Sequence, residues 1–170
     1  MRMMAIPLAC ALLGACQTVP SEPAPGPASL AFEVKSWGAL IHSWSVGADG
    51  AATAVSRQSK SGSPWPPYTL EHRRFTLSAA DLAKLQALAA ALPNPEPTDD
   101  KCQQRMTDAA YGTLSIARGG EARALKFYEG CFDAYYAPYI AQVKAIDALV
   151  MDAAVKAPVE RREEVAGTSS

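Results

Sequence analysis

The stretch YGTLSIARGGEARALKFY, residues 111–128, decides the fold. In each half of it, two apolar residues lie two positions apart, and Gly119-Gly120 separates the halves. A spacing of two is that of a half-buried strand, and a glycine pair permits a tight turn. The stretch therefore predicts a β-hairpin whose apolar positions are Leu114 and Ile116 in the first strand, and Leu125 and Phe127 in the second.

Alternating patterns upstream of this hairpin predict further strands. Residues 30–37 and 40–46 alternate, and residues 52–57 follow the hairpin signal Asp49-Gly50. Residues 68–77 alternate again after a loop rich in serine and proline.

Two segments carry the helical spacing. Ser78 and Asp81 have the arrangement of a helix start, and a leucine stripe follows until Pro93 ends the helix. A second helix is expected from about Ala134 to Val155, with Tyr139, Val143, Ile146 and Val150 on its buried side. The order of strands, helix, hairpin and helix predicts an α+β fold, an antiparallel sheet of about five strands with two helices packed on one face.

The N-terminus has the layout of an export signal. Arg2 precedes an apolar run, Ala5 to Ala15, which is about as long as a signal core and too short to span a bilayer. Leu13-Gly14-Ala15-Cys16 resembles the lipobox of bacterial lipoproteins. The resemblance implies that Cys16 is acylated and becomes the first mature residue, anchoring the protein in the membrane. The same resemblance implies that Gln17, where Asp would favour the inner membrane, directs the protein to the outer membrane, and the domain is expected to face the periplasm.

The domain organisation follows from composition. Residues 1–15 are expected to be the signal peptide, 16–29 a lipidated cysteine and proline-rich tether, 30–156 a single domain, and 157–170 a disordered tail. The net charge of −1 over 170 residues gives no indication of nucleic-acid binding. No cofactor motif is present.

Two cysteines, Cys102 and Cys131, remain after the signal region. In an exported protein they are expected to form a disulfide, which would stabilise the domain by about 3–4 kcal/mol in the chain-entropy model. Free thiols or a reactive cysteine are the alternatives. Two cysteines and two distant histidines do not make a zinc site.

Candidates for chemistry are few. His42 and His72 are the only histidines, and no spacing marks either as a metal ligand. No catalytic residue is predicted. The stiff aromatic loop from Trp65 to Tyr68 is either a recognition surface or a cover for the sheet edge. Tyr135 and Tyr136 either line a groove or pack the disulfide.

These observations favour a non-enzymatic lipoprotein that binds another envelope component, with Trp65, Tyr68, Tyr135 and Tyr136 as candidate contacts. One alternative is a small envelope hydrolase with His42, His72 or an acid pair as its base. The other is a purely structural envelope lipoprotein.

Overall fold

The computed structural model describes residues 26–59 and 63–166, so the predicted signal peptide, Cys16 and most of the tether lie outside the described residues. Seven strands and two helices follow one another along the chain. They are β1 (Ser29–Ser36), β2 (Ala39–Val46), β3 (Ala51–Gln58), β4 (Tyr68–Thr76), α1 (Ala79–Ala90), β5 (Tyr111–Arg118), β6 (Glu121–Tyr128), α2 (Ala137–Ala154) and β7 (Val159–Val165).

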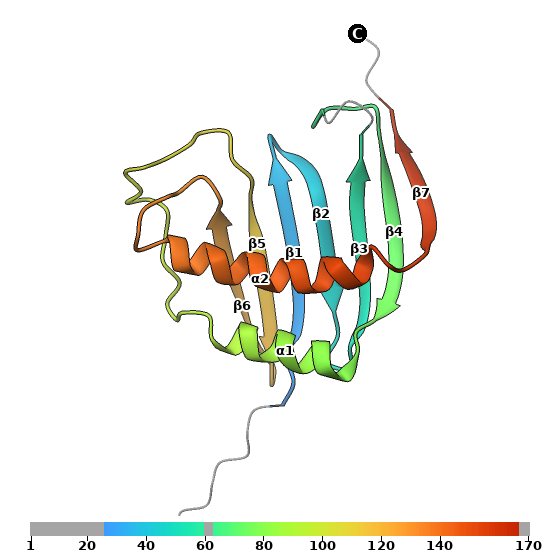
Figure 1. Ribbon diagram of the computed structural model, residues 1–170, viewed down its shortest axis with the longest axis horizontal. Helices are drawn as coiled ribbons and strands as arrows, with labels where there is room; N and C mark the ends of the chain where they lie inside the picture. Colours follow the sequence, from blue (N-terminus) through green and yellow to red (C-terminus); the bar gives the residue numbers. More distant parts are fainter. Residues whose placement is uncertain (1–25, 60–62, 167–170) are drawn as a thin grey trace, which may run out of the picture.

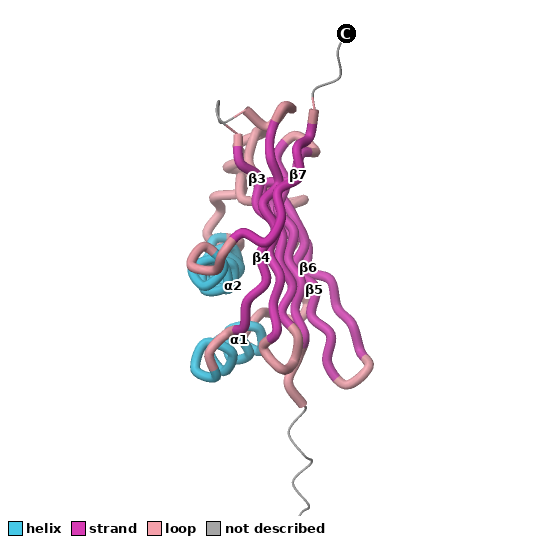
Figure 2. The backbone as a smooth tube through the Cα atoms, turned by 90° about the vertical axis from the view of Figure 1, so that its right-hand side faces the viewer, coloured by secondary structure: helices cyan, strands magenta, loops and turns pink. Residues whose placement is uncertain are grey.

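The strands form one sheet in the order β6-β5-β1-β2-β3-β4-β7, and each neighbouring pair is antiparallel (Figure 1). Both helices lie on the same face, and no helix of the described residues lies on the other face (Figure 2). The predicted α+β class and the placement of two helices on one face are confirmed. The predicted strand number of about five is an undercount, because the sheet has seven strands.

The predicted disordered tail is wrong over Val159–Val165, which form the edge strand β7. Its sequence VERREEV has no alternating apolar pattern, because polar pairs and not a buried face hold it to β4. Arg162 donates to Glu71 at 3.0 and 2.9 Å, and Thr69 donates to Glu164 at 3.0 Å. The domain therefore extends to Val165, beyond the predicted end at residue 156.

The core lies between the sheet and the helices. α1 begins as predicted, with the Ser78 hydroxyl accepting from the Asp81 amide at 3.1 Å. Its stripe buries Leu85 fully, and α2 buries Val143, Ile146 and Val150. Each such side chain stabilises the fold by about 1.5–3 kcal/mol through burial. The stripes confirm the predicted inner faces of both helices.

An aromatic stack crosses the inner face of the sheet. The Phe32 ring lies 5.2 Å from that of Phe127 and 5.4 Å from that of Trp44, measured between centroids. Phe127 pairs with Gly112 on the intervening strand β5. A Cβ on Gly112 would lie 2.6 Å from the Phe127 ring and 1.9 Å from the Glu33 carbonyl oxygen, so only glycine leaves room for this stack.

A candidate binding surface at one end of the sheet

The two ends of the sheet differ in what they carry. The described chain enters at Gly26 and runs into the start of β1, so this end is called the tether end (Figure 1). β1 and β3 finish at the opposite end, where β2, β4 and β5 begin. With about 3.3 Å per residue over eight residues, the two ends are roughly 26 Å apart.

Exposed apolar side chains gather at the end away from the tether. Among the described residues, seven large hydrophobic side chains are exposed, and six of them lie in segments that enter or leave the sheet there. We call these six the aromatic end: Trp37, Trp65, Met106, Tyr111, Phe132 and Tyr135. The seventh, Val155, follows α2. Exposed apolar side chains concentrated in one region are typical of a contact surface.

The predicted loop Trp65 to Tyr68 lies at this end, between β3 and β4. Trp65 is 56% exposed, so it does not tuck back over the sheet edge. Arg57 of β3 contacts both ends of the loop. Its Nη1 donates to the Pro64 carbonyl at 3.1 Å, and its guanidinium lies 5.7 Å from the centre of the half-buried Tyr68 ring. The loop therefore presents Trp65 on a braced support, which limits the entropy lost on binding.

Trp37 is the strongest candidate that the sequence analysis missed. It forms the β1–β2 turn with Gly38, and the two have φ angles of 53° and 79°. Two-residue hairpin turns of this kind prefer asparagine or aspartate before glycine, and a bulky residue in the left-handed region costs about 1–2 kcal/mol. Because Trp37 is also 58% exposed, the core does not compensate this strain. Strain retained at an exposed aromatic residue indicates a functional position.

Tyr111 supports this turn from the neighbouring strand. Its hydroxyl accepts a hydrogen bond from the Gly38 amide at 3.1 Å, and the side chain is 40% exposed. The signal that could have located Trp37 is the Trp-Gly pair between two alternating segments, since tryptophan is a poor turn residue.

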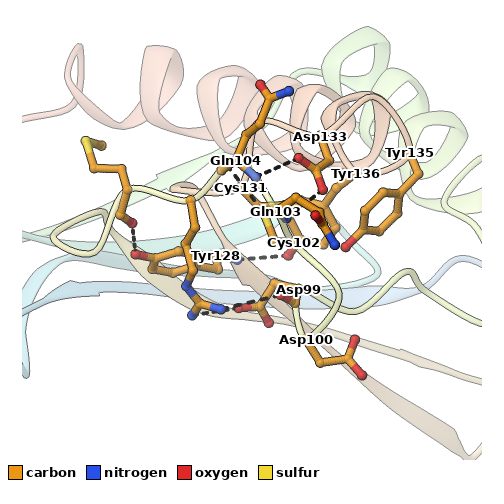
Figure 3. The surroundings of a disulfide bond; sticks show 12 residues. Asp99, Asp100, Cys102, Gln103, Gln104, Tyr128, Cys131, Asp133, Tyr135 and Tyr136 are labelled. Carbon is orange, nitrogen blue, oxygen red and sulfur yellow. Dashed lines mark hydrogen bonds and ion pairs between the residues drawn. A yellow bond between two sulfur atoms is a disulfide. The ribbon is translucent and has the colours of Figure 1, made fainter.

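The predicted disulfide is confirmed: Cys102 and Cys131 are joined, with their Cα atoms 5.8 Å apart. Asp133 reinforces this link, because its two carboxylate oxygens accept from the amides of Gln103 and Gln104 at 2.8 and 2.9 Å (Figure 3). The segments before β5 and after β6 are thereby fixed together. Two members of the aromatic end, Met106 and Phe132, lie within a few residues of the crosslink.

The two tyrosines predicted as possible contacts have different environments. Tyr135 is 46% exposed and its hydroxyl donates to the Thr98 carbonyl at 3.1 Å. Tyr136 is only 1% exposed, so its prediction as a surface contact is wrong. The Tyr136 hydroxyl accepts from the Tyr128 amide at 3.0 Å, and the Tyr139 hydroxyl donates to the Lys126 carbonyl at 2.8 Å. Both therefore satisfy backbone groups along the free edge of β6.

Burial sets the titration of these tyrosines. Removal from water raises the pKa of the Tyr136 and Tyr139 hydroxyls, since it disfavours the phenolate. Both groups accordingly stay neutral as hydrogen-bonding groups at physiological pH.

Each histidine lies beside a carboxylate. His42 Nε2 is 2.8 Å from Asp147 Oδ1, and Trp44 Nε1 donates to the same oxygen at 2.8 Å. His72 Nε2 is 3.2 Å from Glu163 Oε2 on the exposed surface between β4 and β7. The pair formed by His42 and Asp147 therefore ties α2 to β2.

One group of side chains has the proximity of a metal site. The sulfurs of Cys102 and Cys131 and a carboxylate oxygen of Asp133 lie within 4.8 Å of one another. The disulfide removes both thiolates as ligands, and the Asp133 oxygens already accept two amide hydrogen bonds. The group thus acts as a crosslink.

Among the described residues, no helix is both long and apolar enough to cross a bilayer.

Comparison with known proteins gives no relative. What the chain does must be inferred from its own residues, because it matches no protein-family model, no curated protein and no solved structure.

Proposed function

We propose that the chain is a bacterial outer-membrane lipoprotein, anchored by acyl groups on Cys16, whose domain binds another protein of the envelope through the aromatic end. The domain would face the periplasm and act without catalysis. The lipobox-like Leu13 to Cys16 supports the anchor.

The observation that carries the binding role is the distribution of exposed apolar side chains. Of the seven large apolar side chains that are exposed in the described residues, six lie at the end of the sheet opposite Gly26. Gly26 lies at the end from which the chain continues toward the predicted anchor. A tethered domain presents its far end to partners away from the membrane. Tryptophan and tyrosine on braced supports are the residue types that dominate binding energy at protein interfaces.

The binding surface is tested by crosslinked co-purification from envelope membranes. The Trp37→Ala/Trp65→Ala variant and the Trp65→Ala/Tyr68→Ala variant are compared with Val155→Ala, which removes an exposed apolar side chain outside the aromatic end. We expect one envelope protein to be enriched with the wild type and with Val155→Ala, and to be lost from both tryptophan variants. Equal enrichment with all of them would reject the aromatic end as the contact surface.

The anchor is tested separately by metabolic labelling with a palmitate analogue. Label should enter the wild type and be absent from Cys16→Ser. Label in neither protein would reject the lipoprotein assignment while leaving the binding surface to its own test.

A further inference from the structure

A pocket of about 970 Å³ lies at the tether end, on the same side of the sheet as the helices. The last turn of α1, the start of the described chain and the β5–β6 hairpin enclose it. Its polar lining residues are Asn94, Glu96, Arg118, Glu121 and Arg123, and Gly26 also lines it. We call it the arginine pocket.

Two arginines project into this region from adjacent strands. Ile116 pairs with Arg123, and Arg118 pairs with Glu121, so the two arginines lie diagonally across the hairpin on the same face as the buried Leu114 and Leu125. Diagonal neighbours of this kind are about 7–8 Å apart at their backbones, within reach of one ligand.

Neither guanidinium has a carboxylate partner among residues 26–59 and 63–166. Arg118 Nη2 donates to Gln86 Oε1 at 3.4 Å, and Arg123 Nη2 donates to the Pro93 carbonyl, both neutral acceptors. The Nε atoms of both arginines are buried and make no hydrogen bond. Of the other six arginines in the described chain, five have an Asp or Glu within 4.0 Å, namely Arg73, Arg74, Arg105, Arg161 and Arg162.

The two glutamates of the pocket do not neutralise it at close range. Glu121 is exposed at the turn and Glu96 is half-buried, and neither lies within 4.0 Å of an arginine nitrogen. The groups left without partners are donors. Two guanidinium groups without a carboxylate favour an anion over a cation as the ligand of the pocket.

We propose that the arginine pocket binds a phosphate group. The planar guanidinium donates two parallel hydrogen bonds to phosphate oxygens, and two such forks on one face match a tetrahedral anion. The pocket also adjoins the root of the tether, since Gln86 donates to the Ala28 carbonyl at 2.6 Å and accepts from its amide at 2.8 Å.

This location determines where the phosphate can come from. Gly26 lies ten positions after Cys16, and a fully extended proline-rich chain of that length reaches about 30 Å. An anchored domain could therefore bring the pocket to a phospholipid headgroup, whereas a free phosphate would reach it from solution. The headgroup source rests on the proposed anchor at Cys16; the phosphate site itself does not.

The test measures phosphate binding by full-length protein in neutral detergent. Isothermal titration with inorganic phosphate is performed on the wild type, on Arg118→Gln/Arg123→Gln, and on Arg74→Gln/Arg161→Gln as a matched control. The control removes the same two charges from side chains that are 72% and 58% exposed. Arg118→Lys/Arg123→Lys keeps the charge without the fork and serves if the Gln variant does not fold, as judged by circular dichroism.

We expect the Gln variant to bind phosphate at least about tenfold more weakly, the Lys variant to show a smaller loss, and the control to stay within about twofold of the wild type. Flotation of Cys16→Ser protein, which lacks the proposed acyl anchor, with phosphatidylcholine vesicles with and without phosphatidic acid then identifies the source. Arginine-dependent flotation only with phosphatidic acid supports a headgroup ligand, and phosphate binding without flotation supports a soluble one. No phosphate binding by the wild type, or equal losses in variant and control, would overturn the site whether or not Cys16 is acylated.

Discussion

The buried hydroxyl of Tyr136 provides the most direct test of how the β6 edge is stabilised. Tyr136→Phe removes one oxygen atom and leaves the Tyr128 amide without its partner at 3.0 Å. Tyr136 is 1% and Tyr128 is 8% exposed, so water cannot replace the lost acceptor. An unsatisfied buried donor costs about 1–3 kcal/mol. For a domain of this size, the loss corresponds to a fall in Tm of roughly 2–12 °C.

Tyr135→Phe is the matched control, since it removes the same atom from the preceding residue. Its hydroxyl donates to the Thr98 carbonyl at an exposed position, where water replaces the bond at a cost of about 0.5 kcal/mol or less. Urea unfolding of both variants at neutral pH measures the difference, and hydrogen exchange at the Tyr128 amide should accelerate only in Tyr136→Phe. Equal stability of the two variants, with unchanged exchange, would refute the role assigned to the Tyr136 hydroxyl.

Three further predictions concern other contacts. The Cys102–Cys131 disulfide spans 29 residues, and its reduction should lower the free energy of unfolding by about 3–4 kcal/mol. Mass spectrometry should find these two cysteines alkylated only after reduction. Alkylation of both in unreduced protein would reject the crosslink. Asp147→Ala should lower the free energy of unfolding by about 1.5–3 kcal/mol, because it leaves His42 and Trp44 without their shared acceptor. Asp147→Asn keeps an acceptor oxygen and should lose less than half of that stability when both variants are compared by thermal unfolding. Equal losses would contradict the acceptor role. Arg162 and Arg73 hold the pKa of the Glu71 carboxyl below its ordinary value of 4.5. The wild type should therefore be more stable than Glu71→Gln above pH 4.5, and this difference in the free energy of unfolding should shrink as the pH falls below that value. A difference that grows on acidification would contradict this sign.

The elements with an apolar period could be predicted from the sequence. The hairpin at residues 111–128 forms β5 and β6, and the stripes of α1 and α2 face the core. These predictions succeeded because burial of one face imposes a period of two or 3.6 on the residues themselves. The disulfide succeeded for a different reason, since only two cysteines remained to pair.

β7 could not be predicted in this way. It is an edge strand whose contacts are hydrogen bonds and ion pairs with β4, such as Arg162 with Glu71, and such pairs leave no apolar period. Which charged residues form ion pairs with one another depends on how the fold brings the strands together. The same limit applies to Tyr136, because adjacent tyrosines at a helix start give no sign of which one turns inward.

Only part of the aromatic end could be predicted from the sequence. Trp65 was recognised because prolines flank it, and its exposure agrees with that interpretation. Trp37 was assigned to a strand, and its importance depends on a φ of 53° that no local pattern indicates. The arginine pocket depends on register, since Arg118 and Arg123 become neighbours only when the hairpin pairs as it does.

The two edges and the helix-free face of the sheet offer less apolar surface than the aromatic end, which is the proposed contact surface. At one edge, β7 has charged residues at positions 160–164, which oppose the addition of another strand. At the other edge, the hydroxyls of Tyr136 and Tyr139 already occupy backbone groups of β6.

On the helix-free face, the apolar side chains of Val55 and Leu70 are half-buried. Its central strands present short polar side chains on the side opposite the buried Trp44, Ala54 and Leu114. These are Ser43, Ser45, Thr53, Thr113 and Ser115. Apolar burial drives most protein association, and among the described residues the exposed apolar side chains lie almost entirely at the aromatic end. We therefore expect loss of both Trp37 and Trp65 to weaken binding of the proposed envelope partner more than any pair of substitutions on the two edges.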